Sequence, residues 1–372
     1  MKTLNVYRTY FPDPPGGLQE AIRQICLSTQ KFDIQNEIFT LSKKPTPRLI
    51  QAPEATIYRE KSWMAPASCD IGGIKAFMEF NRLSASADLI HLFHPWPFAE
   101  LLNLVVNKSK PRLLTYISDV VRQKQLGKIY LPLMNKTLDN VDLIVANCPN
   151  YVKTSPVLSK TKFEHKIKVI PLGIDQASYP VIDNPIESLH RFHFDKTKPF
   201  FLFVGVLRYY KGLHTLLEAA KNTSQAIVIA GSGPEEARLK QMAAELQLSN
   251  VFFIGSITNE EKVALLKLCT ALILPSHLRS EAYGMVLVEA SMYGKPMISC
   301  EIGTGTSFVN LHHQTGFVVA PENPTQLSDA IHQLSDVSTS TTFGIQARQR
   351  YDELFSGIAL GKAYSDAYRV LL

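Results

Sequence analysis

The stretch Phe200-Phe201-Leu202-Phe203-Val204 leads directly into Gly205, and it decides the fold. An unbroken apolar run of this length has no polar face, which is typical of a strand covered by helices on both sides. The same pattern, an apolar run that ends at glycine or at Pro-Ser, recurs at residues 226–230, 251–254 and 271–274. Helical stretches separate these runs. The second half of the chain is therefore predicted to be an α/β domain with a parallel sheet.

The first half alternates in the same way. Residues 4–7, 89–92 and 143–146 are predicted strands, and residues 16–29 are a predicted helix entered through a glycine pair. After residue 175, a segment rich in Pro and Asp interrupts the alternation from residue 179 to residue 199. This interruption indicates a domain boundary.

The fold class predicted from this pattern is α/β, with two Rossmann-like parallel-sheet domains. Their predicted bounds are 1–175 and 176–350, and a helical segment, 351–372, follows them. The sequence leaves open whether that segment crosses back to the first domain. Ligands of such sheets bind beyond the carboxyl ends of the strands, so we expect the glycine-rich loops of both domains to face one interdomain cleft.

Length and composition exclude several classes of protein. The 372 residues are 45% hydrophobic, enough for two domains with separate cores. There is no run of about 20 apolar residues that would span a bilayer, and Arg8 interrupts the start before a signal-peptide core could form. We therefore expect a soluble cytoplasmic protein. Its five cysteines are scattered without metal-ligand spacing, so we predict reduced thiols, no metal site and no cofactor.

The formal net charge of +6 is modest, but basic residues gather in one stretch of the first half. These residues are Lys108, Lys110, Arg112, Arg122, Lys124, Lys128 and Lys136. One interpretation is ordinary solvated surface. The other is a face that meets anionic phospholipid or a pyrophosphate-bearing acceptor. Nucleic acid is not expected as a partner, because no recognition motif accompanies the charge.

Two carboxylates frame the stretch from Ser280 to Ala290. Glu289 lies among apolar residues, and its burial would be costly without hydrogen bonds, which a polyhydroxylated ligand would supply. The alternative is that Glu289 faces solvent on an amphipathic helix and that Glu281 is a first-turn acid. Positions eight apart differ by roughly 80° around a helix, so both acids would not share one face. We therefore expect Glu281 and the Tyr283-Gly284 turn in a loop ahead of the helix, whose free N–H groups suit sugar oxygens or phosphate.

The order of these motifs resembles that of the GT-B-fold retaining glycosyltransferases of family four, over nearly the whole chain. The segments that carry this resemblance are Gly16-Gly17, 171–175, 205–212, 231–234 and 281–289. A narrower set of segments is similar to bacterial mannosyl- and D-rhamnosyltransferases of O-antigen and related polysaccharide assembly: 10–13, 118–124, 207–212, 275–281 and 299–306. The resemblance implies GDP-sugar donors, lipid-diphosphate-linked acceptors, an acceptor-side first domain and a nucleotide-sugar-binding second domain.

The resemblance also implies roles for charged residues. The leaving nucleoside diphosphate carries charge that two cations near a helix N-terminus would stabilise without metal, and Arg208 and Lys211 are the candidates. They could instead be surface cations, but Gly205 and Gly212 on either side favour close approach of a ligand to the backbone. Relatives often carry Arg directly after the glycine, where this chain has Val206.

In the family, the later acid binds the ribose hydroxyls and the earlier acid contacts the hexose. This implies that Glu289 binds ribose and Glu281 the sugar, while Tyr283, Gly284 and Met285 present backbone amides. Glu281 is not taken as a nucleophile, because retaining enzymes of this fold are thought to bring the acceptor to the same face as the leaving phosphate.

Other candidates carry two interpretations each. Gly16 and Gly17 either let the backbone approach the diphosphate or acceptor, or form a tight turn. Gly303 and Thr304 either line the donor pocket or belong to a strand-to-helix loop. Relatives often have histidine at the position of Phe93, whereas this chain has His94 one place later, so His94 is either an acceptor-side or sugar-side residue or a structural histidine.

An acceptor-side cluster is predicted at Ser118, Asp119 and Arg122, and its alternative is a helix N-cap with first-turn charges. Relatives often have histidine before the Ser-Asp pair, where this chain has Ile117.

The resulting hypothesis is a retaining, metal-independent hexosyltransferase of bacterial cell-surface glycan biosynthesis. It would use GDP-mannose or a related GDP-deoxyhexose and act as a peripheral protein at the cytoplasmic membrane face. Three alternatives stay open: a UDP-sugar donor, a sugar-nucleotide epimerase with two Rossmann-like domains, and a catalytically silent nucleotide-sugar-binding partner.

Overall fold

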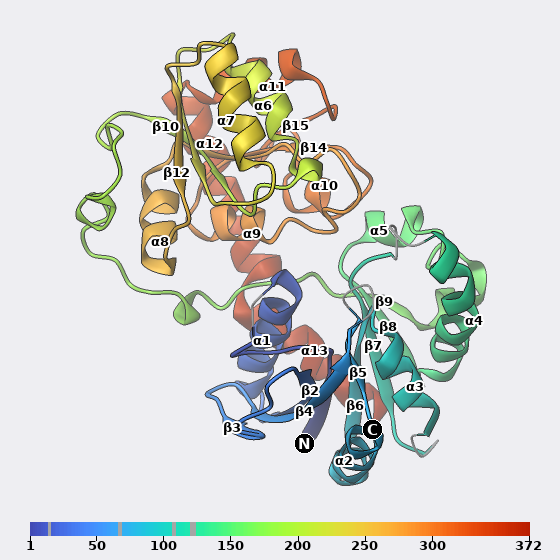
Figure 1. Cartoon of the computed structure of the whole chain (residues 1–372). Coiled ribbons are helices and arrows are strands. Elements are labelled where there is room, and N and C mark those ends of the chain that lie inside the picture. Colours follow the sequence, from blue (N-terminus) through green and yellow to red (C-terminus); the bar gives the residue numbers. More distant parts are fainter. Residues whose placement is uncertain (14–15, 66–68, 106–108, 120–123) are drawn as a thin grey trace. The chain divides into compact units, whose positions relative to one another are not determined.

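A computed structural model describes residues 1–13, 16–65, 69–105, 109–119 and 124–372. The chain divides into two compact units (Figure 1). Unit 1 comprises Met1–Asp175 together with Gly357–Leu372, and unit 2 comprises Gln176–Ser356. Each unit is a parallel-sheet α/β structure with its own buried core, as the strand pattern predicted.

Unit 2 contains a fully parallel sheet with the strand order β12-β11-β10-β13-β14-β15. The strands are β10 (Phe200–Val204), β11 (Ala226–Ala230), β12 (Val251–Gly255), β13 (Ala271–Leu274), β14 (Met297–Cys300) and β15 (Gly316–Val319). The first four confirm the predicted strands. The chain adds strands on one side of β10 and then returns to its other side, so a topological switch point lies between β10 and β13.

The helices of unit 2 are α6 (Leu213–Ala220), α7 (Glu236–Glu245), α8 (Asn259–Leu268), α9 (Met285–Met292), α10 (Thr306–Val309), α11 (Pro324–Leu334) and α12 (Val337–Arg350). Local sequence sets where they begin. Thr258 and Glu261 form a capping box at the start of α8, in which each side chain accepts a hydrogen bond from the backbone N–H of the other. Single helical turns lie at Tyr209–Lys211 and Tyr351–Phe355.

Unit 1 has a sheet of strand order β3-β4-β2-β1-β6-β7-β8-β9, with β5 paired to β4. The strands are β1 (Lys2–Val6), β2 (Gln35–Ser42), β3 (Leu49–Gln51), β4 (Thr56–Met64), β5 (Ile71–Gly72), β6 (Leu89–His94), β7 (Arg112–Tyr116), β8 (Leu143–Ala146) and β9 (Ile167–Val169). Among the strands that the structure describes in unit 1, only the β3–β4 and β4–β5 pairs are antiparallel. The switch point of this sheet lies between β1 and β6.

The helices of unit 1 are α1 (Gly17–Gln30), α2 (Ile74–Ser86), α3 (Pro97–Val105), α4 (Lys124–Asn140), α5 (Pro149–Thr154) and α13 (Gly357–Leu371). Helix α13 packs against α1 (Figure 1). His91 ties it to the sheet, because its Nδ1 lies 2.8 Å from the Tyr368 hydroxyl and its Nε2 lies 2.7 Å from Thr115 Oγ1. Burial lowers the pKa of His91 to about 3, so the ring is neutral.

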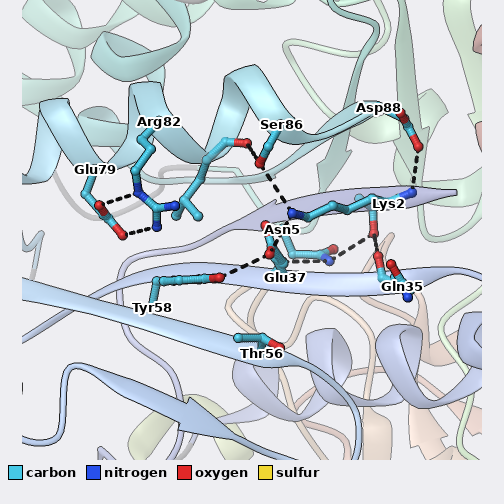
Figure 2. Close-up of polar contacts among 12 residues, drawn as sticks. Lys2, Asn5, Gln35, Glu37, Thr56, Tyr58, Glu79, Arg82, Ser86 and Asp88 are labelled. Carbon is cyan, nitrogen blue, oxygen red and sulfur yellow. Dashed lines mark hydrogen bonds and ion pairs between the residues drawn. The ribbon is translucent and has the colours of Figure 1, made fainter.

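A polar network joins residues near the start of β1, β2 and β4 in unit 1 (Figure 2). Lys2 Nζ donates to Ser86 Oγ at 3.3 Å and forms an ion pair with Glu37 at 2.9 Å. The Tyr58 hydroxyl donates to the same Glu37 oxygen at 3.2 Å. These bonds lie at the amino edge of the sheet, opposite the edge where ligands of such folds bind. The network therefore stabilises strand pairing.

The basic stretch of the first half is not one solvated face. Arg112 is only 5% exposed in β7, so the surface interpretation is wrong for this residue. Lys110 Nζ donates to the carbonyls of Ala85 and Ala87, whereas Lys136 is exposed. Lys108 and Arg122 lie outside the described residues. All five cysteines are free thiols, four of them buried. Over the described residues, no helix combines the length and apolarity needed to cross a membrane.

Candidate functional site

Two loops meet at the switch point of unit 2. One follows β10 and contains Gly205 and Gly212, and the other follows β13 and begins at Pro275. Gly212 has φ of +71°, and a Cβ there would collide with the carbonyl oxygen of Pro275. The backbone N–H of His277 donates to Tyr210 O at 3.0 Å. Glycine at position 212 therefore allows the two loops to pack backbone against backbone.

This packing brings together two residues from the predicted site. Lys211 Nζ forms an ion pair and hydrogen bond with Glu281 Oε2. Ser276 Oγ donates to the same carboxylate oxygen at 3.3 Å. Burial lowers the pKa of Lys211, but the Glu281 carboxylate and its hydrogen bond, with Tyr210, outweigh burial, and the pKa is raised overall. Lys211 therefore keeps its positive charge at neutral pH.

Arg208 stands on the same loop, directly before the Tyr209–Lys211 turn, and its side chain is exposed. Its charge acts on Lys211 and slightly opposes the protonation of that ammonium group. The loop thus presents one exposed cation and one cation paired with a carboxylate.

Glu281 lies in a loop and α9 begins at Met285, with Gly284 as its N-cap at φ of +85°, as predicted. The interpretation of Glu289 as a solvent-facing helix residue is wrong, because Glu289 is only 8% exposed. Its Oε1 accepts hydrogen bonds from the Tyr179 hydroxyl at 2.6 Å and from Lys262 Nζ at 2.7 Å. These protein groups supply bonds that the sequence analysis expected from a ligand.

Hydrogen bonds join the loop after β14 to the loop that contains Glu281. Thr304 is fully buried, and its hydroxyl donates to Glu281 O at 2.8 Å, so this hydroxyl does not line an open pocket. The carbonyl of Gly303 accepts from Arg279 Nη1 at 2.8 Å. Tyr283 is 3% exposed and its ring packs on Gly305, so the ring is covered.

In unit 1, His94 closes β6 and is 1% exposed. Its Nδ1 lies 3.0 Å from Glu100 Oε1, and the Tyr130 hydroxyl donates to that same oxygen. The ring stacks on Tyr116 with centroids 4.4 Å apart. Nε2 has no hydrogen-bond partner among the described residues. The ring is thus enclosed by Tyr116, Tyr130 and Glu100.

The glycine pair after β1 lies at the carboxyl edge of the unit 1 sheet. Gly16 is the N-cap of α1 with φ of −149°, an extended conformation that any residue adopts. A Cβ at Gly17 would have nothing within 4 Å, so open space adjoins the start of the helix.

Asp119 is bound by hydroxyl groups of unit 1. Its carboxylate accepts from Tyr116 at 2.9 Å, Ser155 at 2.6 Å and Tyr151 at 3.1 Å. Ser118 beside it is half-buried, and Arg122 lies outside the described residues. The acceptor-side cluster is thus described only in part.

Sequence reasoning found the charged residues at the two sheet edges but missed several of their partners. Tyr179 and Lys262 lie 110 and 27 positions from Glu289, and Tyr130 lies 36 positions from His94. Glu100 is only six positions from His94, but it lies in the next helix. Single-sequence patterns carry no signal for such distant pairs.

The chain is similar to known proteins over nearly its whole length. Residues 186–350 match the family model described as glycosyl transferases group 1. The chain is 42% identical to the D-rhamnosyltransferase WbpZ of Pseudomonas aeruginosa, over 96% of this chain and 92% of that protein. It is 38% identical to the O-antigen chain mannosyltransferase C of Escherichia coli, over 100% of this chain and 99% of that protein.

Solved structures share the fold at low sequence identity. Alr3699/HepE of Anabaena, crystallised with UDP, matches with a TM-score of 0.78 and 18% identity over 100% of both chains. Sucrose-phosphate synthase from Thermosynechococcus elongatus matches with a TM-score of 0.78 and 22% identity, over 100% of this chain and 98% of that one. The two parallel-sheet α/β units thus have the GT-B fold, and with relatives 42% and 38% identical along nearly its whole length, the chain belongs to the group 1 glycosyltransferase family.

Proposed function

We propose that this glycosyltransferase transfers mannose or a related deoxyhexose from a GDP-sugar to a lipid-linked or polysaccharide acceptor in bacterial cell-surface glycan biosynthesis. The names of the rhamnosyl- and mannosyltransferase relatives support this substrate class. The observation that carries the proposal is the Lys211–Glu281 ion pair at the switch point, with Arg208 exposed on the same loop.

The chemistry follows from charge. As the bond between the hexose C1 and the phosphate oxygen breaks, negative charge develops on the leaving diphosphate. Arg208 and Lys211 stabilise that charge without a metal ion. Glu281 fixes the Lys211 ammonium and presents its carboxylate to the hexose, while Gly284 and Met285 at the start of α9 offer backbone N–H groups to sugar or phosphate oxygens.

Retention is the proposed stereochemical course. The acceptor hydroxyl oxygen bonds to C1 on the face that the diphosphate leaves, and its proton passes to the departing phosphate oxygen. In this course Glu281 forms no covalent bond to the sugar. NMR of the product tests it, since an inverted anomeric configuration would contradict the proposal.

Glu289 is proposed to bind the ribose of the donor. Tyr179 and Lys262 hold one of its oxygens and thereby orient the carboxylate, and Lys262 reduces the electrostatic cost of burying it. In unit 1, the open space at Gly17 supports approach of the diphosphate or acceptor to the backbone. Ser118 and Asp119 are proposed to lie on the acceptor side.

We also propose peripheral contact with an anionic bilayer at the cytoplasmic face, through an apolar patch of unit 1 that consists of Trp63, Met64, Ile74 and Met78. Each of these side chains is at least 60% exposed. They are contiguous, because the Trp63 ring lies against Gly73 at the start of α2 and Met78 follows Ile74 by one helical turn. Exposed Lys61 and Lys75 adjoin them, which gives the combination of apolar and basic groups that anionic lipid surfaces attract.

Vesicle sedimentation tests the membrane contact. Trp63→Ser combined with Ile74→Ser is expected to weaken binding to anionic vesicles strongly, while Val337→Ser, at an equally exposed position of unit 2, leaves it unchanged. Equal sedimentation of all three proteins would contradict the assignment of this patch.

Thermal unfolding with GDP, UDP, ADP, GDP-mannose and UDP-N-acetylglucosamine tests the donor, because a ligand that binds only the folded state raises Tm. A selective rise with GDP and GDP-mannose is expected. Selectivity for UDP would overturn the donor assignment and keep the reaction class, and no shift with any nucleotide would contradict the donor site. Conversion of the sugar nucleotide to an isomer without an acceptor would indicate an epimerase instead.

A further inference from the structure

Three side chains of unit 2 converge beside the Lys211 loop. His214 comes from the first turn of α6, His277 from the loop after β13, and Glu322 from the turn before α11. One potential ligand atom from each lies within 4.8 Å of the other two. His214 Nε2 and Glu322 Oε1 are 3.7 Å apart. No role described above uses this cluster.

His277 is the unusual member. It is only 7% exposed, and neither ring nitrogen has a hydrogen-bond partner in the part of the chain that the structure describes. Buried polar groups of this kind are rarely left unsatisfied. The ring is held perpendicular to two neighbours, with centroids 4.9 Å from Tyr209 and 5.1 Å from His214. A fixed imidazole therefore lies next to another imidazole and a carboxylate.

We propose that His214, His277 and Glu322 bind a divalent transition-metal cation of the zinc class. Two imidazoles and one carboxylate are a ligand set that zinc accepts, and they leave a fourth position for water. Zinc–ligand bonds of about 2.0–2.2 Å require the three ligand atoms to move closer together. Glu322 can make this movement, because its side chain is 60% exposed.

The site lies beside the two loops of the proposed donor site, which follow β10 and β13. His214 lies in the first turn of α6, three positions after Lys211, and His277 precedes Glu281 on the loop after β13. A bound cation would cross-link the two loops whose packing creates the Lys211–Glu281 pair. Only this consequence rests on the proposed function, whereas metal uptake itself can be measured without any sugar nucleotide.

The test uses the full chain, stripped of metal and titrated with Zn²⁺, with Co²⁺ as a spectroscopic substitute. We expect one equivalent of Zn²⁺ to remain after gel filtration, Tm to rise, and Co²⁺ to give a visible absorption band. Glu322→Gln and His277→Gln should each weaken binding more than the ~10–100-fold typical of residues that only support a ligand. The Glu322 side chain is exposed, so Glu322→Gln should fold normally, and weaker binding in this variant cannot be attributed to misfolding.

The matched control is His313→Asn, at an exposed histidine outside the cluster whose φ of +59° asparagine tolerates. It should leave uptake unchanged. Absence of saturable uptake by the wild type, or uptake that survives both cluster variants, would overturn the proposal. The His277 ring would then be explained by its contacts with Tyr209 and His214 alone. Failure of GDP-sugar binding would leave these metal results unaffected, so the two proposals fail separately.

Discussion

Lys211 and Glu281 form an ion pair between the loops that follow two neighbouring strands of unit 2, β10 and β13. The pair lies where the strand order reverses, between β10 and β13. A carboxylate and an ammonium group are thus fixed together at the edge where ligands of such sheets bind.

Lys211→Ala is expected to lower kcat by roughly ten- to a hundredfold, because a charged hydrogen bond contributes about 1.5–3 kcal/mol. The exposed Lys240, paired with Glu236 on the surface of α7, provides a matched control, and Lys240→Ala should keep wild-type kinetics. Initial rates of sugar transfer measure both. A Lys211 variant with unchanged kcat would remove it from leaving-group stabilisation.

Arg208→Ala is expected to lower kcat to a similar extent while leaving Tm within about 1 °C of wild type, because its side chain is exposed. The combination of lost turnover and retained stability is the distinguishing readout. If turnover is retained, the exposed cation of this loop takes no part in the reaction.

Glu289→Ala and Tyr179→Phe separate binding from stability. The alanine variant removes the carboxylate and should raise the donor Kd more than tenfold. The phenylalanine variant removes one hydrogen bond and should cost about 1 kcal/mol of folding free energy with little change in Kd. Calorimetric titration with GDP and urea unfolding measure the two quantities. If Glu289→Ala changed the donor Kd as little as Tyr179→Phe, Glu289 would have a purely structural role.

His91 predicts how the stability of unit 1 depends on pH. Its pKa is about 3 in the folded state and about 6.5 when unfolded, so the unfolded chain binds the additional proton between these values. The contribution is fully present above pH 6.5 and is lost as pH falls towards 3. At pH 5 the free energy of unfolding should be about 2 kcal/mol lower than at pH 7.

Tryptophan fluorescence suits this measurement, because both tryptophans, Trp63 and Trp96, belong to unit 1. In His91→Gln, which keeps hydrogen-bonding capacity but does not titrate, the pH dependence should diminish by that amount. If the unfolding free energy of wild type and of His91→Gln depended on pH in the same way, groups other than His91 would cause that dependence.

Turnover is expected to survive EDTA, because in the proposed reaction Arg208 and Lys211, and not a metal ion, stabilise the charge of the leaving group. If His214, His277 and Glu322 hold a cation, EDTA should lower Tm but change kcat by less than about twofold. Loss of turnover that magnesium or manganese restores would contradict the two-cation account.

The fold could be predicted because its signals are local. Apolar runs such as Phe200–Val204 indicate buried parallel strands by themselves, and the glycines after them mark the loops. Strand β14 was not predicted, because the polar Ser299 interrupts its apolar run. Arg112 was assigned to the surface, since nothing in the sequence shows that a strand residue of this type is covered.

The candidate site was predictable only in part, for a related reason. Glu281, Glu289 and Lys211 could be named from their residue types and neighbouring glycines, but their partners depend on tertiary packing. Tyr179 is 110 positions from Glu289, and Lys262 is 27 positions from it. His214 and His277 likewise meet through the packing of Gly212 on Pro275, which no spacing rule describes.

Because α13 belongs to unit 1, that unit cannot be completed until unit 2 has been synthesised. The chain leaves unit 1 after Asp175 and rejoins it at Gly357, so all of unit 2 is translated before the partner of α1 and His91 exists. Unit 2 is a continuous segment and can fold as it leaves the ribosome. The side of the unit 1 sheet that α13 covers therefore stays exposed to solvent until α13 has been synthesised.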